Sequence, residues 1–173
     1  MTTMHSRTKK IAFLALFAAL AIGIYGLESL IPNPFPIPGV KLGLANIVTL
    51  VVLRRFGIRE ASLVLVVRIL LCALLFGNGM TLLYSATGGI LCLVVEFFIN
   101  KFLRGHAIFV TAIFGALVHN AGQLVIAYFF TKVINVIIYA PYLVVAAILT
   151  GLFSGLCAHF TLKLLPRVLK DED

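Results

Sequence analysis

Residues 10–39 read KIAFLALFAALAIGIYGLESLIPNPFPIPG, and this stretch decides the fold class. Its first part, from Lys10 to Ile31, is apolar over the length of roughly 17 to 25 residues that a membrane-spanning helix needs. Four alternating prolines then occupy positions 32 to 38, where they remove backbone donors and force an extended path. The stretch therefore predicts a spanning helix that is followed by a loop of fixed shape.

The composition of the whole chain agrees with a membrane protein. Of the 173 residues, 62% are hydrophobic and 12% are charged, and the mean hydropathy is +1.14. Soluble domains are about half apolar and a quarter charged, so no soluble core of this size would hide so much apolar surface. We expect one transmembrane domain over residues 1–173, with lipid as its main solvent.

The remaining apolar runs predict five further spans, which makes six transmembrane helices in all. Glycines, an asparagine or short basic clusters separate the runs. In the last run, Pro141 suits the first turn of a helix, and Pro166 ends that helix. The second run is short and is expected to start below the membrane surface. The expected spans are residues 40–56, 59–76, 80–100, 107–130 and 140–165.

The basic residues predict the orientation, because cytoplasmic loops retain Lys and Arg. With residues 1–9 in the cytoplasm, all Lys and Arg residues except Lys41, Lys132 and Arg68 fall on the cytoplasmic side. Arg68 lies within a span, and only Lys41 and Lys132 lie outside. We therefore expect a multi-pass protein of the cytoplasmic membrane, with both the N-terminal segment and the tail at residues 166–173 in the cytoplasm.

Arg68 and Glu96 are charged residues inside predicted spans, where a charge costs about 2.5 to 3.5 kcal/mol on insertion scales. Arg68 is near the middle of the third span, and Glu96 is about one turn from the inner end of the fourth. One interpretation is a buried ion pair that fixes helix register. The other is that Arg68 faces an anionic ligand. The ion pair is favoured, because a buried charge needs a partner first.

Most other polar residues of the spans gather toward the outer side. His119, Asn120 and Gln123 are neighbours on one helix, and Lys41 provides a point charge for an acidic group. Such a gathering favours a solvated cavity for a small molecule with a polar end over a purely structural polar network. The other members are Glu28, Asn46, Asn78, Tyr84, Ser85 and Thr87.

Small residues form two stripes that allow close helix packing. Ala12, Ala15, Ala19 and Gly23 share one face of the first span, and Gly151 and Gly155 repeat the spacing in the last span. Such stripes serve either packing within the chain or docking of another membrane subunit.

The sequence lacks several kinds of catalytic motif. It has no glycine-rich phosphate loop with a following Lys-Ser/Thr pair, so ATP hydrolysis by this chain is not expected. His5, His106 and His159 are far apart, and Cys72, Cys92 and Cys157 stand singly in apolar runs, so we expect no metal site, no disulfide framework and no cofactor.

Three stretches carry a family resemblance: PGVKLGLANI at 38–47, LYSATGG at 83–89 and GALVHNAGQL at 115–124. Together they resemble the Gx transporter family, also labelled heptaprenyl diphosphate synthase component I. That family is similar to the substrate-binding (S) subunits of energy-coupling factor (ECF) transporters. The resemblance implies a six-helix bundle with an outward-facing pocket, a gating loop that contains Lys41, and a partner face at Ala15 and Ala19. It also implies that the pocket residues include Asn46, Tyr84, His119, Asn120 and Gln123.

Two functions follow as hypotheses. The first is a membrane substrate-binding subunit for uptake of a small vitamin-like or quinone or isoprenoid precursor, energised by separate ATPase and coupling subunits. The alternative is a non-catalytic membrane component of heptaprenyl diphosphate or menaquinone biosynthesis. Prenyl diphosphate synthesis relies on aspartate-rich motifs that hold magnesium, and the only aspartates here are Asp171 and Asp173, so we do not expect an enzyme.

Overall fold

The computed structural model describes residues 2–30, 41–76, 79–104, 106–132, 138 and 140–165, and most of these residues lie in α-helices. The prediction of an all-α chain is confirmed, and helices occur in all six predicted regions. In chain order they are α1 (Thr2–Leu30), α2 (Asn46–Phe56), α3 (Ile58–Phe76), α4 (Gly79–Phe102), α5 (Ile108–Thr131) and α6 (Ala140–Leu164).

Four of these helices are long and apolar enough to cross a membrane. The corresponding stretches are Arg7–Leu30 in α1, Gly79–Phe102 in α4, Ile108–Phe130 in α5 and Ala140–Leu164 in α6. Helix α3 has 19 residues but carries Arg59, Glu60 and Arg68. The chain is therefore a membrane protein with four candidate spans, and six transmembrane helices remain a prediction.

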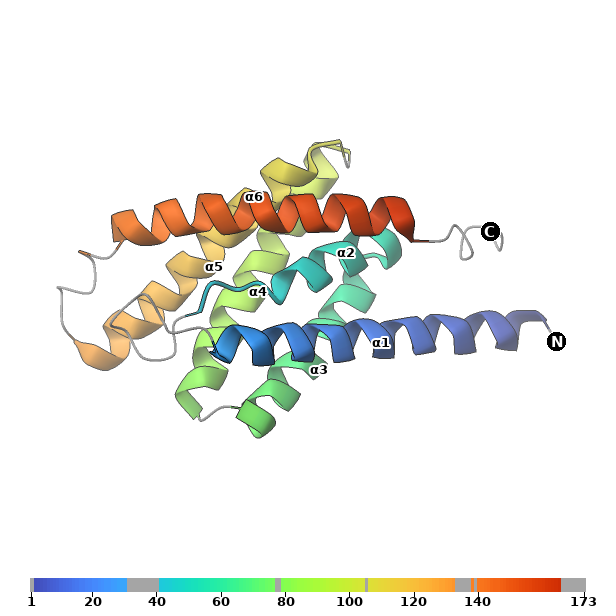
Figure 1. The fold of residues 1–173 in the computed structure, drawn as a ribbon, viewed down its shortest axis with the longest axis horizontal. Coiled ribbons are helices and arrows are strands. Elements are labelled where there is room, and N and C mark those ends of the chain that lie inside the picture. The colour runs from blue at the N-terminus through green and yellow to red at the C-terminus, as the bar shows by residue number, and fades with distance from the viewer. Residues whose placement is uncertain are drawn as a thin grey trace.

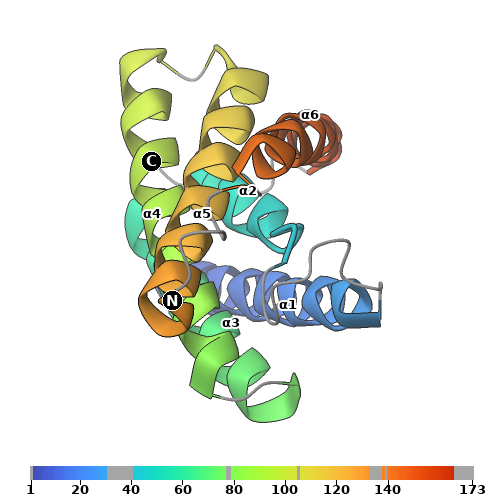
Figure 2. The same cartoon turned by 90° about the vertical axis from the view of Figure 1, so that its left-hand side faces the viewer.

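Helix α2 is much shorter than the predicted second span. It has 11 residues and is about 17 Å long, whereas the hydrocarbon layer is about 30 Å thick. It begins at Asn46 instead of residue 40 because Gly43 has φ +81°, a conformation that no helix contains. The side chains from Asn46 to Leu53 are all buried. Figure 2 shows why, since α2 lies between α6 and α1.

The other helices surround this buried centre. Helices α4 and α5 pack along each other, and α1 and α6 lie on opposite sides of α2 (Figure 1). Helix α1 begins and α6 ends at the same end of the molecule, as an even number of crossings requires. Helix α1 begins eight residues before Lys10, so the predicted N-terminal segment is largely a helical extension of the first span.

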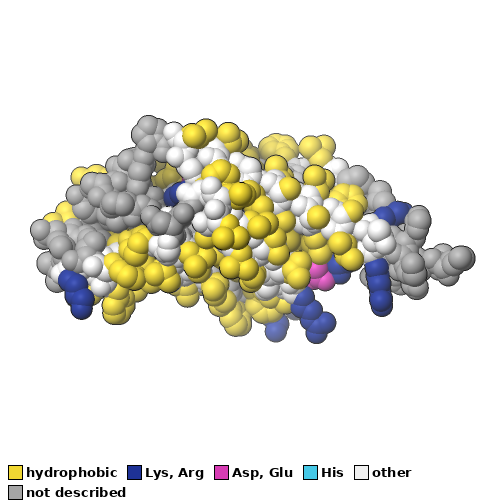
Figure 3. Space-filling model, turned by 90° about the horizontal axis from the view of Figure 1, so that it is seen from below, with side chains coloured by type: hydrophobic (Ala, Val, Ile, Leu, Met, Phe, Trp, Pro, Cys, Tyr) yellow, Lys and Arg dark blue, Asp and Glu magenta, His cyan; other side chains and the backbone are white. Residues whose placement is uncertain are grey.

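The surface matches a lipid environment. Seen from below in Figure 3, hydrophobic side chains cover the middle of the molecule, and most of the Lys and Arg side chains in view lie toward the end where α1 begins. At that end Lys10 forms an ion pair with Glu60 at 2.6 Å. The proline-rich stretch at 32–39 and the tail at 166–173 lie outside the described residues, as do Gly77 and Asn78.

Candidate functional site

Glu28, near the end of α1, holds the residues that precede α2. One carboxylate oxygen, Oε1, accepts a hydrogen bond from the backbone N–H of Gly43 at 2.7 Å. The other, Oε2, accepts one from the backbone N–H of Leu44 at 3.2 Å. The side chain of Glu28 is 6% exposed, so these charge-assisted hydrogen bonds form away from solvent. They fix residues 41–45, hereafter the 41–45 segment, against α1.

His119 on α5 is the centre of a buried polar network. Its Nδ1 lies 3.0 Å from Asn46 Nδ2, and its Nε2 lies 2.8 Å from Gln123 Nε2. Arg68 Nη1 on α3 donates to Asn46 Oδ1 at 3.0 Å. The backbone N–H of Lys41 donates to Gln123 Oε1 at 3.2 Å. The network thus connects α3, α5, the start of α2 and the segment that leads into it.

The hydrogen-bonding roles at His119 are in conflict. A guanidinium and a backbone N–H can only donate, so the oxygen of Asn46 must face Arg68 and the oxygen of Gln123 must face Lys41. Both amide NH₂ groups then face the ring. A neutral imidazole has one acceptor nitrogen, so one of the two contacts sets N–H against N–H.

The conflict persists even where the ring finds another acceptor. The backbone of Gly88 accepts a hydrogen bond from the His119 ring, but the amide NH₂ that faces the protonated nitrogen still lacks an acceptor at that contact. A buried donor without an acceptor costs about 1–3 kcal/mol.

Two glycines hold the His119 ring in place. A Cβ on Gly43 would lie 2.9 Å from both Cδ2 and Nε2 of the ring, and one on Gly88 of α4 would lie 2.7 Å from both Cε1 and Nδ1. Only residues without a side chain allow the 41–45 segment and α4 to approach the imidazole this closely.

The ammonium of Lys41, a partly buried residue, lies against α1. Its Nζ donates to Ser29 Oγ and lies 3.5 Å from the centroid of the Tyr25 ring, in a cation–π position. Tyr25 itself is buried. The 41–45 segment therefore brings three backbone N–H groups to Glu28 and Gln123 and one positive charge to the Tyr25 ring.

Tyr84 and Asn120, two other predicted site residues, lie together in a different place. Asn120 Nδ2 donates to the backbone oxygen of Leu143 on α6 at 3.1 Å. Tyr84 packs in a small cluster with Leu143 and Ala127. Both side chains are buried at the contact of α4 and α5 with α6, and no hydrogen bond among the described residues links them to His119.

The predicted ion pair between Arg68 and Glu96 is not formed. Arg68 bonds Asn46 instead, and no ion pair joins the two charges among the described residues. Glu96 on α4 is 2% exposed, interacts with the thiol of Cys92, and lies against Gly115 of α5. The short helix α2 offers Arg68 a nearer partner, Asn46.

The predicted partner face points away from the core. Ala15 and Ala19 of α1 are exposed, whereas Ala18 and Ala21 of the same helix are buried. Ala15 also lines a groove of about 240 Å³ between α1 and α3. The stripe is therefore free, within the described residues, for lipid or another protein.

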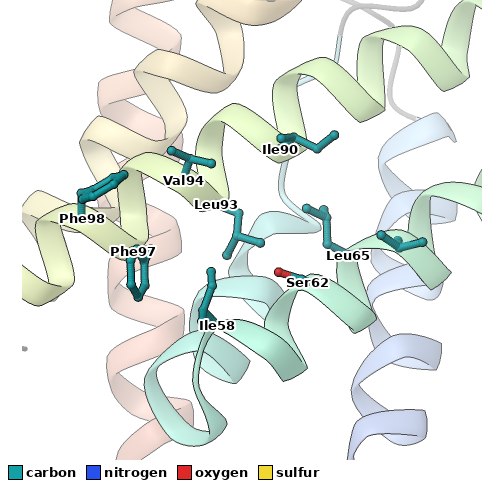
Figure 4. A pocket seen from close by; sticks show the side chains of 9 residues that line it. Ile58, Ser62, Leu65, Ile90, Leu93, Val94, Phe97 and Phe98 are labelled. Carbon is teal, nitrogen blue, oxygen red and sulfur yellow. The ribbon is translucent and has the colours of Figure 1, made fainter.

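A second groove, between α3 and α4, lies away from the polar network. Figure 4 shows its lining side chains, among which Ser62 is the one polar group. Its volume is about 270 Å³. Such a surface lacks the fixed polar contacts that orient a small molecule, so we do not treat it as the candidate site. Its lining residues include Ile58, Leu65, Ile90, Leu93, Val94, Phe97 and Phe98.

The structure thus joins four of the six predicted binding residues, namely Lys41, Asn46, His119 and Gln123, with Arg68. Sequence reasoning did not assign a role to Tyr25, Ser29, Gly43 or Gly88, and it named Glu28 without a partner. A glycine between Leu42 and Leu44 was a signal of a tight backbone approach. No group of three or more His, Cys, Asp or Glu residues that suits a metal ion occurs in the described parts of the chain.

The fold and this site define an all-α membrane protein with a buried polar centre under a short non-helical segment. The chain belongs to the heptaprenyl diphosphate synthase component I family, whose family model matches residues 17–161. The match covers every residue of the polar centre, so the family named from the sequence motifs is confirmed. No curated protein and no solved structure matches the chain.

Proposed function

We propose that the chain is the substrate-binding subunit of a membrane uptake system, with a fold like that of the ECF S subunits. It captures a small vitamin-like molecule, or a quinone or isoprenoid precursor, from the outer side of the cytoplasmic membrane. The observation that carries the proposal is the convergence of Arg68, Asn46, His119 and Gln123 beneath the 41–45 segment.

The conflict at His119 favours binding over a purely structural role. A network that serves structure alone gains from having every donor and acceptor satisfied, and this one leaves a donor unmatched at the ring. Unmatched buried polar groups occur where a molecule or a second conformation supplies the missing partner. We therefore place the solute at His119, after the 41–45 segment has moved.

The same proposal includes partners. Two further subunits, an ATPase and a membrane coupling protein, energise uptake, and the coupling protein docks on the exposed stripe at Ala15 and Ala19. Both chain ends then lie in the cytoplasm. Support comes from the exposure of these alanines and from the shared end at which α1 begins and α6 ends.

The test is recovery of a bound solute. The protein is purified in mild detergent, denatured, and searched by mass spectrometry for small molecules, beside Gln123→Leu and the control Thr111→Val. Thr111 is a buried polar residue of the same helix. Its hydroxyl donates to the backbone oxygen of Ala107, one turn earlier, and takes no part in the network around His119. We expect one compound in the wild type and the control and none in Gln123→Leu. A wild type that is empty after expression in rich medium, with no affinity across a vitamin panel, contradicts the proposal.

A second function is favoured by the family match. In that case the chain is a non-catalytic membrane component that works with a soluble prenyl diphosphate synthase. Co-expression with the synthase from the same genome then changes the length or the amount of the prenyl product. An unchanged product, measured by chromatography of extracted lipids, removes this second candidate.

A further inference from the structure

The 41–45 segment fills the polar centre with the kinds of group that a small ligand carries. The backbone N–H groups of Gly43 and Leu44 donate to the two oxygens of Glu28, one to each. The backbone N–H of Lys41 lies on Gln123, and its ammonium lies over the Tyr25 ring. In total, three backbone N–H groups donate to a carboxylate and an amide oxygen, and one positive charge lies over an aromatic ring.

Departure of the segment also frees an acceptor beside His119. Once the backbone N–H of Lys41 releases Gln123, Oε1 of that amide is free to accept a hydrogen bond from a bound molecule, while its Nε2 stays beside the ring.

We propose that the 41–45 segment imitates the ligand, and that the ligand is a flat cation with two parallel N–H donors, such as an amidine, a guanidine or a protonated amino-heterocycle. This inference rests on the proposed function and names its solute by chemical class. Two parallel N–H groups match a carboxylate in the bidentate geometry that the backbone donors now adopt on Glu28. The positive charge replaces that of Lys41, and the flat ring lies on the face of Tyr25.

Charge also selects this class among vitamin-like molecules. With the segment gone, the Glu28 carboxylate loses both backbone donors and the nearby Lys41 cation, and a bound cation with paired donors replaces them. A neutral quinone precursor offers acceptor oxygens, which meet a carboxylate and an amide oxygen unfavourably. A cation with paired donors satisfies both groups at once.

The test uses benzamidine as the probe and benzyltrimethylammonium as the control, because the second has the same ring and charge but no N–H. Hydrogen–deuterium exchange is measured on the full chain in detergent, over the peptide that contains Gly43 and Leu44. We expect benzamidine to speed exchange there and to raise the thermal midpoint of unfolding. We expect the control cation to do neither.

Two variants locate the effect. Glu28→Gln keeps the shape of the side chain and should weaken benzamidine binding about tenfold, because the charge-assisted pair is lost. Glu60→Gln removes a carboxylate that pairs with Lys10 at the other end of α1 and should leave binding unchanged. If Glu28→Gln fails to fold, Tyr25→Leu, which removes the aromatic face, is the second variant and should weaken binding several-fold.

Three results overturn the inference: no binding of benzamidine, equal binding of both cations, or binding without faster exchange at Gly43 and Leu44. These results are separate from those for the proposed function. A co-purified solute without paired N–H donors leaves the uptake role intact and removes this ligand class. If the wild type carries no co-purified solute but benzamidine still speeds exchange at Gly43 and Leu44, the uptake role loses its support and the binding site at Glu28 is supported.

Discussion

The small-residue stripes of α1 and α6 have the same spacing but opposite surroundings. On α1, Ala15 and Ala19 are exposed, and a Cβ on Gly23 would have no neighbour within 4 Å. On α6, Gly151 and Gly155 are buried against α5, where a Cβ on Gly151 would lie 2.5 Å from Ile113 Cα. The α6 stripe therefore serves packing within the chain, and the α1 stripe is the one left for a partner. Spacing alone does not distinguish the two.

The largest effect is expected for Gly151→Ala. The new methyl group would overlap the backbone of Ile113, so α5 and α6 must separate, and we expect a loss of about 3 kcal/mol in the free energy of unfolding. Chemical denaturation in mixed micelles measures it. A loss of stability smaller than that of Gly155→Ala would mean that α5 and α6 separate easily. The α6 stripe would then be less tightly packed than the structure indicates.

Gly155→Ala should have a smaller effect of the same sign. Here the methyl group would meet Phe109, at 2.9 Å from its ring and 3.1 Å from its Cα. Because a side chain yields more easily than a backbone, we expect a loss of about 1–2 kcal/mol. Phe109→Leu in the same background makes room and should recover part of the loss, which the same denaturation experiment detects.

Gly23→Ala on α1 should change stability in the opposite direction. With nothing near the added methyl group, the variant gains the helix propensity of alanine and becomes more stable by roughly 0.5–1 kcal/mol. A clear destabilisation would show that the face is covered by another part of the protein in the membrane.

The smallest effect on stability is expected for the double variant Ala15→Leu and Ala19→Leu. Both side chains face lipid or a partner, so the free energy of unfolding should change by less than about 0.5 kcal/mol. Association with the proposed coupling subunit should nevertheless be lost, because leucine keeps the helices apart. Co-purification from membranes measures association, and Leu16→Ala on the exposed surface of the same helix is the control. Retained association would move the docking surface away from α1.

Much of the fold followed from local chemistry, and the exceptions have a common cause. Long apolar runs predicted α1, α4, α5 and α6 to within a few residues at most ends, because lipid requires internally bonded backbone. The start of α2 was wrong by six residues. Nothing in the apolar pattern of residues 40–45 distinguishes a helix from a segment whose N–H groups are bonded by Glu28, a residue on another helix.

In the polar centre, too, local spacing predicted some groupings and the packing of helices decided others. His119 and Gln123 are predicted neighbours because they are four apart on one helix. The grouping of Arg68 with Asn46, and not with Glu96, depends on how deeply α2 enters the bundle. Tyr84 and Asn120 contact Leu143 of α6, which sequence spacing does not reveal.

The sequence by itself determined the solvent of this protein, the number and order of its helices, and which side chains are too polar for lipid. Those properties depend on the transfer energy of each residue and on helical spacing, which are local. Only the tertiary structure decided which stripe faces outward, where Arg68 finds its partner, and that the 41–45 segment closes over His119. Each of these depends on contacts between helices far apart in the chain, where an approach of a few ångströms selects one partner among several.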